Sequence, residues 1–299
     1  MEAVPFDLAN LKVAGSPVPV LDNVRMEANW GATQYAISND GTLIYLPGVF
    51  QGKSTLIWSD RKGHAEQLHF PAETHGTFQL SPDGKRLVIQ AENTKWDVWI
   101  FDLLRGSRSK LTIEGNNRRP VWTPAGRWVT FGSDRAGAYN IFMQSADGSG
   151  EIKQLTKGET VQLPYSWSPD GKLLAFTDND DDEIYLLQIN GESKRQPFAT
   201  TRFTEWEPAF SPDGRLLAYV SDEQGQYDVY IQPYPQTGEK WRISTEGGEE
   251  PVWSRSSGEL FYRNGRKWMA VSYSTNPKFS AELPQVLFEG DYLNVSGRS

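Results

Sequence analysis

The sequence predicts an all-β protein, a β-propeller built from four-stranded antiparallel blades, and three observations carry this prediction. A turn motif related to Ser-Pro-Asp-Gly recurs along the chain, apolar strand-like runs flank each copy, and the copies are evenly spaced. The glycines that end the motif are 43, 42, 45, 43 and 44 residues apart and stand at Gly41, Gly84, Gly126, Gly171, Gly214 and Gly258. A period in the low forties with strand patterning is typical of a propeller with one blade per repeat.

Residues 205–246 show how one repeat reads as four strands. Ser211-Pro212-Asp213-Gly214 predicts a tight turn, because proline presets φ and glycine accepts a positive φ. The strands expected around this turn and the polar hairpin that follows are residues 208–210, 216–220, 228–232 and 241–244. A short polar residue precedes the third strand in several repeats, and we expect it to bond backbone amides at a blade corner; it is Asp97, Asn140 or Asp228.

The repeats predict a single propeller domain over residues 1–299, with six recognisable repeats in residues 30–290. Residues 1–22 resemble the third and fourth strands of the last repeat, so we expect them to form half of a seventh blade. A ring leaves no exposed edge when its two termini share a blade. Residues 291–299 are therefore interpreted as a closing segment or as a truncated end.

Trp-Ser-Pro-Asp-Gly followed by an apolar strand and a Tyr-Asp-Ile-Tyr-like strand is matched closely by residues 165–188 and 208–232. This pattern resembles the TolB-like, WD-like propeller family, and the resemblance covers residues 30–290. It implies the fold more than a function, because such propellers also serve as partner-binding scaffolds and as gating domains of peptidases.

Two further stretches resemble the propeller that follows the kinase domain in certain bacterial Ser/Thr protein kinases. One joins residues 3–7 to residues 17–21, and the other joins residues 46–48 to residues 56–63. The chain has no kinase motif, so this resemblance implies only a sensor-like or docking part.

Composition excludes several classes of function. The net charge is −8, which argues against nucleic acid as a partner, and the absence of cysteine excludes disulfides and thiolate chemistry. No apolar run approaches the length of a membrane span, so we expect no membrane insertion and a soluble monomer. The compartment stays open, with a periplasmic or other extracytoplasmic location in a parent protein as the expectation.

Other candidate chemistry is weak. Residues 48–55 resemble a P-loop but are one residue short and join two strands instead of leading into a helix. The acidic run of residues 178–183, including Asp180 and Asp182, could hold Ca²⁺ but reads more simply as a solvated hairpin. His64, His69 and His75 are not expected to share a metal site, and no Gly-Xaa-Ser-Xaa-Gly motif is present.

The remaining place for a ligand is the mouth of the central channel, which residues just before each first strand would line. These candidate ligand-binding residues are Trp30, Gln34, His75, Thr77, Arg118, Arg119, Gln162, Glu205, Trp206, Glu207, Glu249 and Glu250. One basic pair faces several carboxylates and two tryptophans, a set suited to a cation, an amine-bearing small molecule or a peptide end.

The sequence therefore favours a non-catalytic binding or sensor propeller that engages a protein, a peptide or a small ligand, without a cofactor. One alternative is a hydrolase or lactonase with a divalent ion in the axial channel, held by Glu205, Glu207, Glu249 or Glu250. A second alternative is an interaction scaffold without a pocket. The pattern of residues leaves all three open.

Overall fold

A computed structural model describes residues 55–68, 70, 73–92, 94–178, 183–189, 194–255 and 258–290, together with the backbone of short strands earlier in the chain. The chain divides into two units, Met1–Ser54 and Thr55–Ser299. In the first unit, three pairs of short strands are described: β1 (Glu2–Ala3) with β4 (Val18–Pro19), β2 (Phe6–Asp7) with β3 (Lys12–Val13), and β5 (Tyr35–Ile37) with β6 (Leu43–Tyr45).

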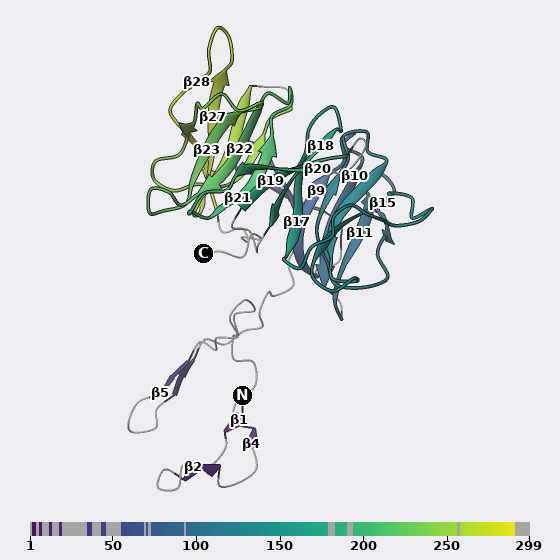
Figure 1. Cartoon of the computed structure of the whole chain (residues 1–299). Coiled ribbons are helices and arrows are strands. Elements are labelled where there is room, and N and C mark those ends of the chain that lie inside the picture. The colour runs from purple at the N-terminus through teal and green to yellow at the C-terminus, as the bar shows by residue number, and fades with distance from the viewer. Residues whose placement is uncertain are drawn as a thin grey trace. The chain divides into compact units, whose positions relative to one another are not determined.

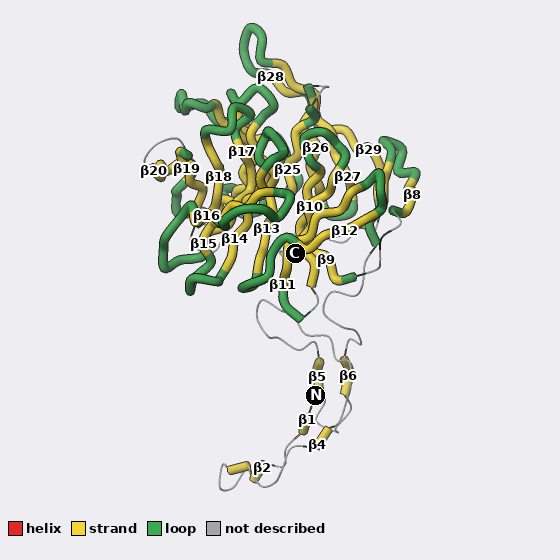
Figure 2. Tube along the Cα trace, turned by 90° about the vertical axis from the view of Figure 1, so that its right-hand side faces the viewer, coloured by secondary structure: helices red, strands yellow, loops and turns green. Residues whose placement is uncertain are grey.

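The described residues of the second unit form five antiparallel blades. The blades lie side by side in Figures 1 and 2. The first two blades are β9 (Thr74–Leu80), β10 (Arg86–Glu92), β11 (Trp96–Asp102) and β12 (Ser107–Lys110), then β13 (Asn117–Trp122), β14 (Trp128–Ser133), β15 (Asn140–Ser145) and β16 (Lys153–Gln154). The next two are β17 (Gln162–Trp167), β18 (Leu173–Asp178), β19 (Glu183–Gln188) and β20 (Lys194–Ala199), then β21 (Glu205–Phe210), β22 (Leu216–Ser221), β23 (Asp228–Pro233) and β24 (Trp241–Arg242).

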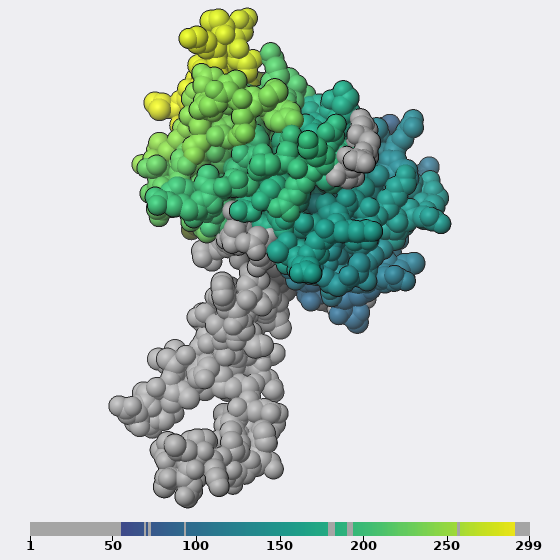
Figure 3. All heavy atoms as spheres, in the orientation of Figure 1, coloured from purple at the N-terminus to yellow at the C-terminus, as the bar shows by residue number. Residues whose placement is uncertain are grey.

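The last blade has a divided outer edge. Its strands are β25 (Glu249–Trp253), β26 (Glu259–Asn264) and β27 (Lys267–Ser274), and both β28 (Ser280–Ala281) and β29 (Gln285–Glu289) pair with β27. The segment around β28 projects from the surface of this blade, at the top of Figure 3. A further hairpin, β7 (Ile57–Ser59) with β8 (Ala65–Gln67), belongs to the same unit.

The all-β propeller prediction is confirmed, but the predicted count of six blades with a partial seventh is wrong for the residues that the structure describes. The expected first blade is divided, because β5 and β6 fall in the first unit while β7 and β8 fall in the second. Its turn copy, Ile37-Ser38-Asn39-Asp40-Gly41, lacks both the proline and the anchoring aromatic of the stronger copies. Within residues 1–22 the described strands β1 to β4 form two-stranded pairs, and residues 291–299 lie outside the described part.

Tryptophans at the anchor position link a blade to the one before it. Trp122 Nε1 donates to the Gln79 carbonyl at 3.1 Å, and Trp253 Nε1 donates to the Ala209 carbonyl at 2.8 Å. The core lies between blades, where one cluster joins Val88 of β10 to Phe131 of β14. Burial of such apolar faces is the main stabilising contribution in a repeat protein.

The turn aspartates support the scaffold. Ser81 Oγ donates to Asp83 Oδ1 at 2.6 Å and accepts the Arg86 N–H at 2.9 Å, while Gly84 adopts a φ of 71°. The same serine–aspartate bond measures 2.7 Å at Ser168–Asp170 and at Ser211–Asp213. These aspartates shape turns and are not placed for catalysis.

The blade corners use a second repeated device. Asp228 Oδ1 accepts from Ser244 Oγ at 2.8 Å and from Gly247 N at 3.2 Å. Asn140 Oδ1 accepts from Gly158 N at 2.8 Å, so both side chains bond backbone amides as expected. Asp97 instead accepts from the Thr112 hydroxyl at 3.3 Å.

Candidate functional site

The first strands of the blades surround the axis of the propeller. β9, β13, β17, β21 and β25 contact one another in this order, each touching the first strand of the next blade. Each of these strands breaks register with its second strand partway along its length. Such a bulge re-aims the residues at the break, so it is the feature that positions side chains near the axis.

Three of the described non-glycine residues have a positive φ, and all three stand at this break. They are Arg119 with 48°, Glu207 with 53° and Glu250 with 56°. A left-handed conformation outside glycine costs on the order of 1–3 kcal/mol and concentrates at functional sites. All three belong to the predicted ligand-binding set, and they share one position in three blades.

Side chains from the preceding blade hold two of these strained residues. Gln90 Oε1 on β10 accepts the Arg119 N–H at 3.0 Å. Glu207 Oε2 on β21 accepts the Glu250 N–H at 2.6 Å. A bulge removes an amide from the ladder, and a buried amide needs a partner, so these bonds fix the bulges and link neighbouring blades.

One further arginine and one tyrosine complete the group, which we call the axial site. It consists of Arg119, Glu207 and Glu250 with Gln90, Tyr165 and Arg263. Arg263 Nε on β26 lies 3.8 Å from Glu250 Oε2. The Arg119 guanidinium lies over the Tyr165 ring, 4.4 Å from its centroid, a cation–π contact. Glu250 Oε1 is buried and has no hydrogen-bond partner among the described residues.

Burial sets the protonation of the two carboxylates. It raises the pKa of Glu207 to about 8, against the lowering effect of Arg119 and with a further raise from Glu250. Burial also raises the pKa of Glu250, and Arg263 opposes this shift. Glu207 keeps partial access to solvent, and its raised pKa favours the protonated form at neutral pH. Strongly perturbed carboxylates near an axis are typical of functional sites.

Four other predicted residues are buried against protein groups. His75 is 5% exposed and burial lowers its pKa, while Trp206 is fully buried and packs on Tyr227. Gln162 Nε2 donates to Asp178 Oδ2 at 3.2 Å. Glu205 is 1% exposed and accepts the Thr201 N–H at 3.2 Å.

The rest of the predicted set lies nearer the surface. Thr77 Oγ1 donates to Gln90 Oε1 at 3.4 Å, and Arg118 is exposed with its guanidinium 4.8 Å from the Tyr139 ring centroid. Glu249 is half-buried beside Glu250. The predictions that fall outside the described residues are Trp30, Gln34, Asp180 and Asp182.

A divalent-metal site gains no support from this arrangement. Within the part of the chain that the structure describes, no three His, Asp or Glu side chains gather in a way that could hold a metal ion. Glu205 is directed to Thr201, and Glu207 bonds the amide of Glu250. The proposed ligands Glu205, Glu207, Glu249 and Glu250 therefore do not form a common coordination group.

Sequence reasoning missed Gln90, Tyr165 and Arg263. Gln90 follows the apolar run Leu87-Val88-Ile89 of a second strand, and Arg263 follows Leu260-Phe261-Tyr262 in the corresponding strand of the last blade. A single polar residue that ends an apolar second strand was the available signal.

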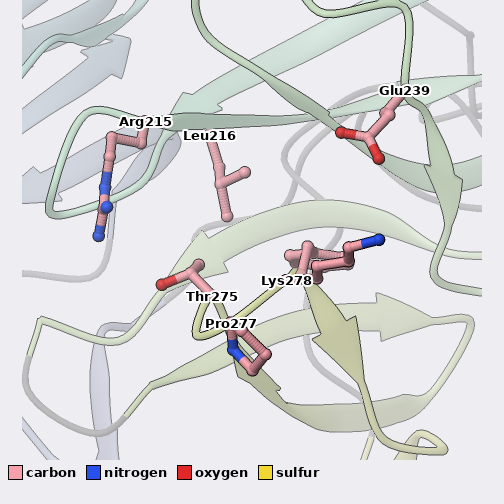
Figure 4. A pocket seen from close by; sticks show the side chains of 7 residues that line it. Arg215, Leu216, Glu239, Thr275, Pro277 and Lys278 are labelled. Atoms are coloured by element: carbon pink, nitrogen blue, oxygen red, sulfur yellow. The ribbon is translucent and has the colours of Figure 1, made fainter.

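A separate hollow of about 310 Å³ lies away from the axial site (Figure 4). It is lined by Arg215, Leu216, Glu239, Thr275, Pro277, Lys278 and Phe279. Phe279 stacks on Trp241 with ring centroids 4.1 Å apart, so the loop before β28 is held on the outer edge of the neighbouring blade. None of the predicted site residues lines this hollow.

The five blades and the charged residues at their bulges define a β-propeller with a polar axial site. Residues 36–181 and 149–287 match the TolB beta propeller domain, PD40, so the chain belongs to this family. Within the described residues no helix is long and apolar enough to cross a membrane.

Curated relatives match parts of the chain. The uncharacterised protein Atu1656 of Agrobacterium fabrum is 30% identical over 184 residues, which cover 58% of this chain and 60% of that protein. The protein TolB homolog of Chlorobium luteolum is 34% identical over 155 residues, which cover 52% of this chain and 31% of the relative. The chain thus covers less than two thirds of the length of either relative.

Solved structures support the fold. The putative TolB from Agrobacterium tumefaciens superposes with a TM-score of 0.62 at 20% identity, covering 78% of this chain and 87% of that one. TolB from Acinetobacter baumannii superposes with a TM-score of 0.63 at 23% identity, covering 79% of this chain and 61% of that one. At these identities the likeness concerns the fold alone.

Proposed function

We propose that this protein is a non-catalytic binding propeller whose ligand reaches the axis and contacts Arg119, Glu207 and Glu250. One observation carries the proposal: the same strained backbone position is occupied by a charged residue in three blades. If these positions served only the scaffold, glycine would suit them better, because it adopts a positive φ without strain. Retaining charged side chains there is consistent with contact to a ligand.

A protein or peptide is the ligand class we favour. The axial site offers carboxylates, guanidiniums and aromatic surface within one group of residues, the elements that recognise a charged peptide segment. A relative from Wolinella succinogenes, named the Tol-Pal system protein TolB, is 35% identical over 78 residues, which cover 25% of this chain and 18% of that protein. For this chain a protein partner is a proposal.

The narrower expectations also remain proposals. The resemblance to the propeller that follows the kinase domain in some bacterial Ser/Thr kinases rests on residues 3–7 with 17–21 and on residues 46–48 with 56–63. A periplasmic or other extracytoplasmic location and a monomeric state are further predictions. No observation in the described residues favours the hydrolase or lactonase alternative.

The test is a binding screen against an array of short peptides with a variant that combines Glu207→Ala and Glu250→Ala. Peptides bound by the wild type are expected to be lost in the double variant, with near-ultraviolet circular dichroism confirming the fold. The matched control combines Glu151→Ala and Glu159→Ala, which change the charge equally at exposed positions and should keep the binding. Equal binding by the axial variant would place the site elsewhere, and a wild type that binds no peptide would exclude the peptide ligand.

A further inference from the structure

We propose, on the basis of the binding function proposed above, that the Glu207–Glu250 pair binds a primary ammonium group of the ligand and that binding releases one proton from Glu207 to solvent. The ammonium could be a lysine side chain or the free amino terminus of a peptide. Both sources share the chemistry of a compact cation with three N–H donors.

The geometry leaves acceptors open for such a group. Glu207 Oε2 accepts the Glu250 backbone N–H at 2.6 Å, which fixes the Glu207 side chain relative to the Glu250 backbone. Glu250 Oε1 is buried with no hydrogen-bond partner among the described residues. A buried acceptor without a donor is unfavourable, so an incoming N–H group that reaches it gains more than it would at the surface.

The net charge of the groups around the pair is balanced either by a proton on Glu207 or by one bound cation. The groups that face it are Arg119 of β13, Arg263 of β26, and Glu249 beside Glu250 on β25. With Glu207 protonated, two carboxylates face two guanidiniums and the group is neutral. With Glu207 ionised, the group carries one negative charge, which an ammonium restores to neutrality.

The exchange is a proton transfer to solvent, and no covalent bond forms between the protein and the ligand. The Glu207 O–H bond breaks, its proton goes to water or buffer, and the carboxylate accepts hydrogen bonds from the ammonium, which keeps all its own protons. Burial raises the pKa of Glu207 to about 8, so the free protein holds this proton at pH 7. A bound cation lowers that pKa, and affinity must then rise with pH until the free carboxyl is ionised.

The test uses three small probes with the intact chain. Nα-acetyl-lysine methylamide carries only a side-chain ammonium with a pKa of about 10.4 and stays charged throughout. Alanine methylamide carries only an α-amino group, and Nα-acetyl-norleucine methylamide is the neutral control. Ligands of this size bind with a Kd on the order of 1 mM, so binding is followed by the NMR shift of the Glu250 N–H in titrations to well above that concentration.

The expected result is binding of at least one ammonium probe, with the lysine and alanine probes distinguishing the two sources. Calorimetry in buffers of different ionisation enthalpy should count about one proton released per ligand at pH 7. The affinity for the lysine probe should rise about tenfold from pH 6 to pH 7 and level off above pH 8. Glu207→Gln should bind the probe at least tenfold more weakly and without pH dependence, whereas Glu151→Gln should match the wild type.

Three results would overturn the inference: no binding of either ammonium probe, equal binding of the norleucine probe, or an affinity that does not change between pH 6 and pH 8. Should Glu207→Gln fail to fold, the wild-type pH profile and Glu250→Gln decide the question. If array peptides still bind through the axial residues while these probes do not, the inference fails and the proposed function stands.

Discussion

The carboxylate of Glu207 accepts a hydrogen bond of 2.6 Å from the backbone N–H of Glu250, the residue that holds the same strained position in the following blade. This contact connects Glu207, a carboxyl group with a raised pKa, to the left-handed backbone of Glu250, which is distant in the sequence. The side chain of one blade thus stabilises the conformation that displays the side chain of the next.

The buried Glu207 carboxyl should make the free energy of unfolding fall as pH rises. Its pKa is about 8 in the folded protein and near 4.5 when unfolded, so the folded state holds more protons between these values and loses stability with increasing pH. One unit of pKa difference is worth about 1.4 kcal/mol, and partial exposure reduces this value. Relative to the wild type, the free energy of unfolding of Glu207→Gln should therefore increase by roughly 2–4 kcal/mol between pH 5 and pH 9. Urea unfolding at pH 5, 7 and 9 measures this, and a difference that stays constant with pH would contradict it.

The left-handed backbone at Arg119 predicts an unusual order of stability. Arg119→Gly should be more stable than Arg119→Ala by about 1 kcal/mol, because glycine adopts a φ of 48° without strain. At the adjacent Arg118, which is not among the positive-φ residues, the order should reverse, with glycine about 0.5–1 kcal/mol less stable than alanine. Thermal unfolding of the four variants provides the comparison. The same order at both positions would mean that backbone strain at Arg119 is negligible.

The corner aspartate of the fourth blade should be the most costly acidic residue to remove. Asp228 is fully buried, accepts from Ser244 and Gly247, and lies 2.5 Å from Arg242. Asp228→Ala leaves these donors unpaired, and we expect a loss of about 3–5 kcal/mol in the free energy of unfolding. The matched control Asp170→Ala removes an exposed turn aspartate and should cost about 1 kcal/mol or less. If both variants lost a similar free energy of unfolding, the hydrogen bonds at the blade corner would contribute no more to stability than a surface turn does.

The anchoring tryptophan of the last blade should contribute a measurable hydrogen bond. Trp253→Phe keeps an aromatic ring but removes the Nε1–H that donates to the Ala209 carbonyl at 2.8 Å. The expected loss is about 1–2 kcal/mol, which includes the orphaned carbonyl. Trp58→Phe, at a side chain that is 50% exposed, should lie within about 0.5 kcal/mol of the wild type in the same denaturation experiment.

Much of the scaffold follows from local sequence. Proline and glycine in Ser211-Pro212-Asp213-Gly214 predict the turn through their own φ preferences, and the structure shows that turn with its serine–aspartate bond. The blade count did not follow, because the weak copy at Ile37–Gly41 has the spacing of a repeat without its proline and aromatic anchor. The spacing of the turn motifs shows the period of the repeats, whereas the formation of a blade also depends on its contacts with neighbouring blades.

The axial site was only partly predictable. Its members Arg119, Glu207 and Glu250 could be chosen from the alignment of repeats, but the same alignment also selected Glu205 and Trp206, which the structure buries. Gln90 and Arg263 lie on second strands, whereas the predicted set was chosen from the residues before first strands. Strand direction and burial at a bulge depend on the partner strand and on the next blade, which a single repeat does not reveal.

The sequence by itself determined the all-β class, the repeat period and the chemistry of the turns, because these depend on interactions within a few residues. Only the tertiary structure decided the five blades of the described part, the left-handed backbone at Arg119, Glu207 and Glu250, and the raised pKa of Glu207. These properties arise where residues 29 and 43 positions apart in the chain contact each other and exclude water, and such desolvation is a property of the packed molecule.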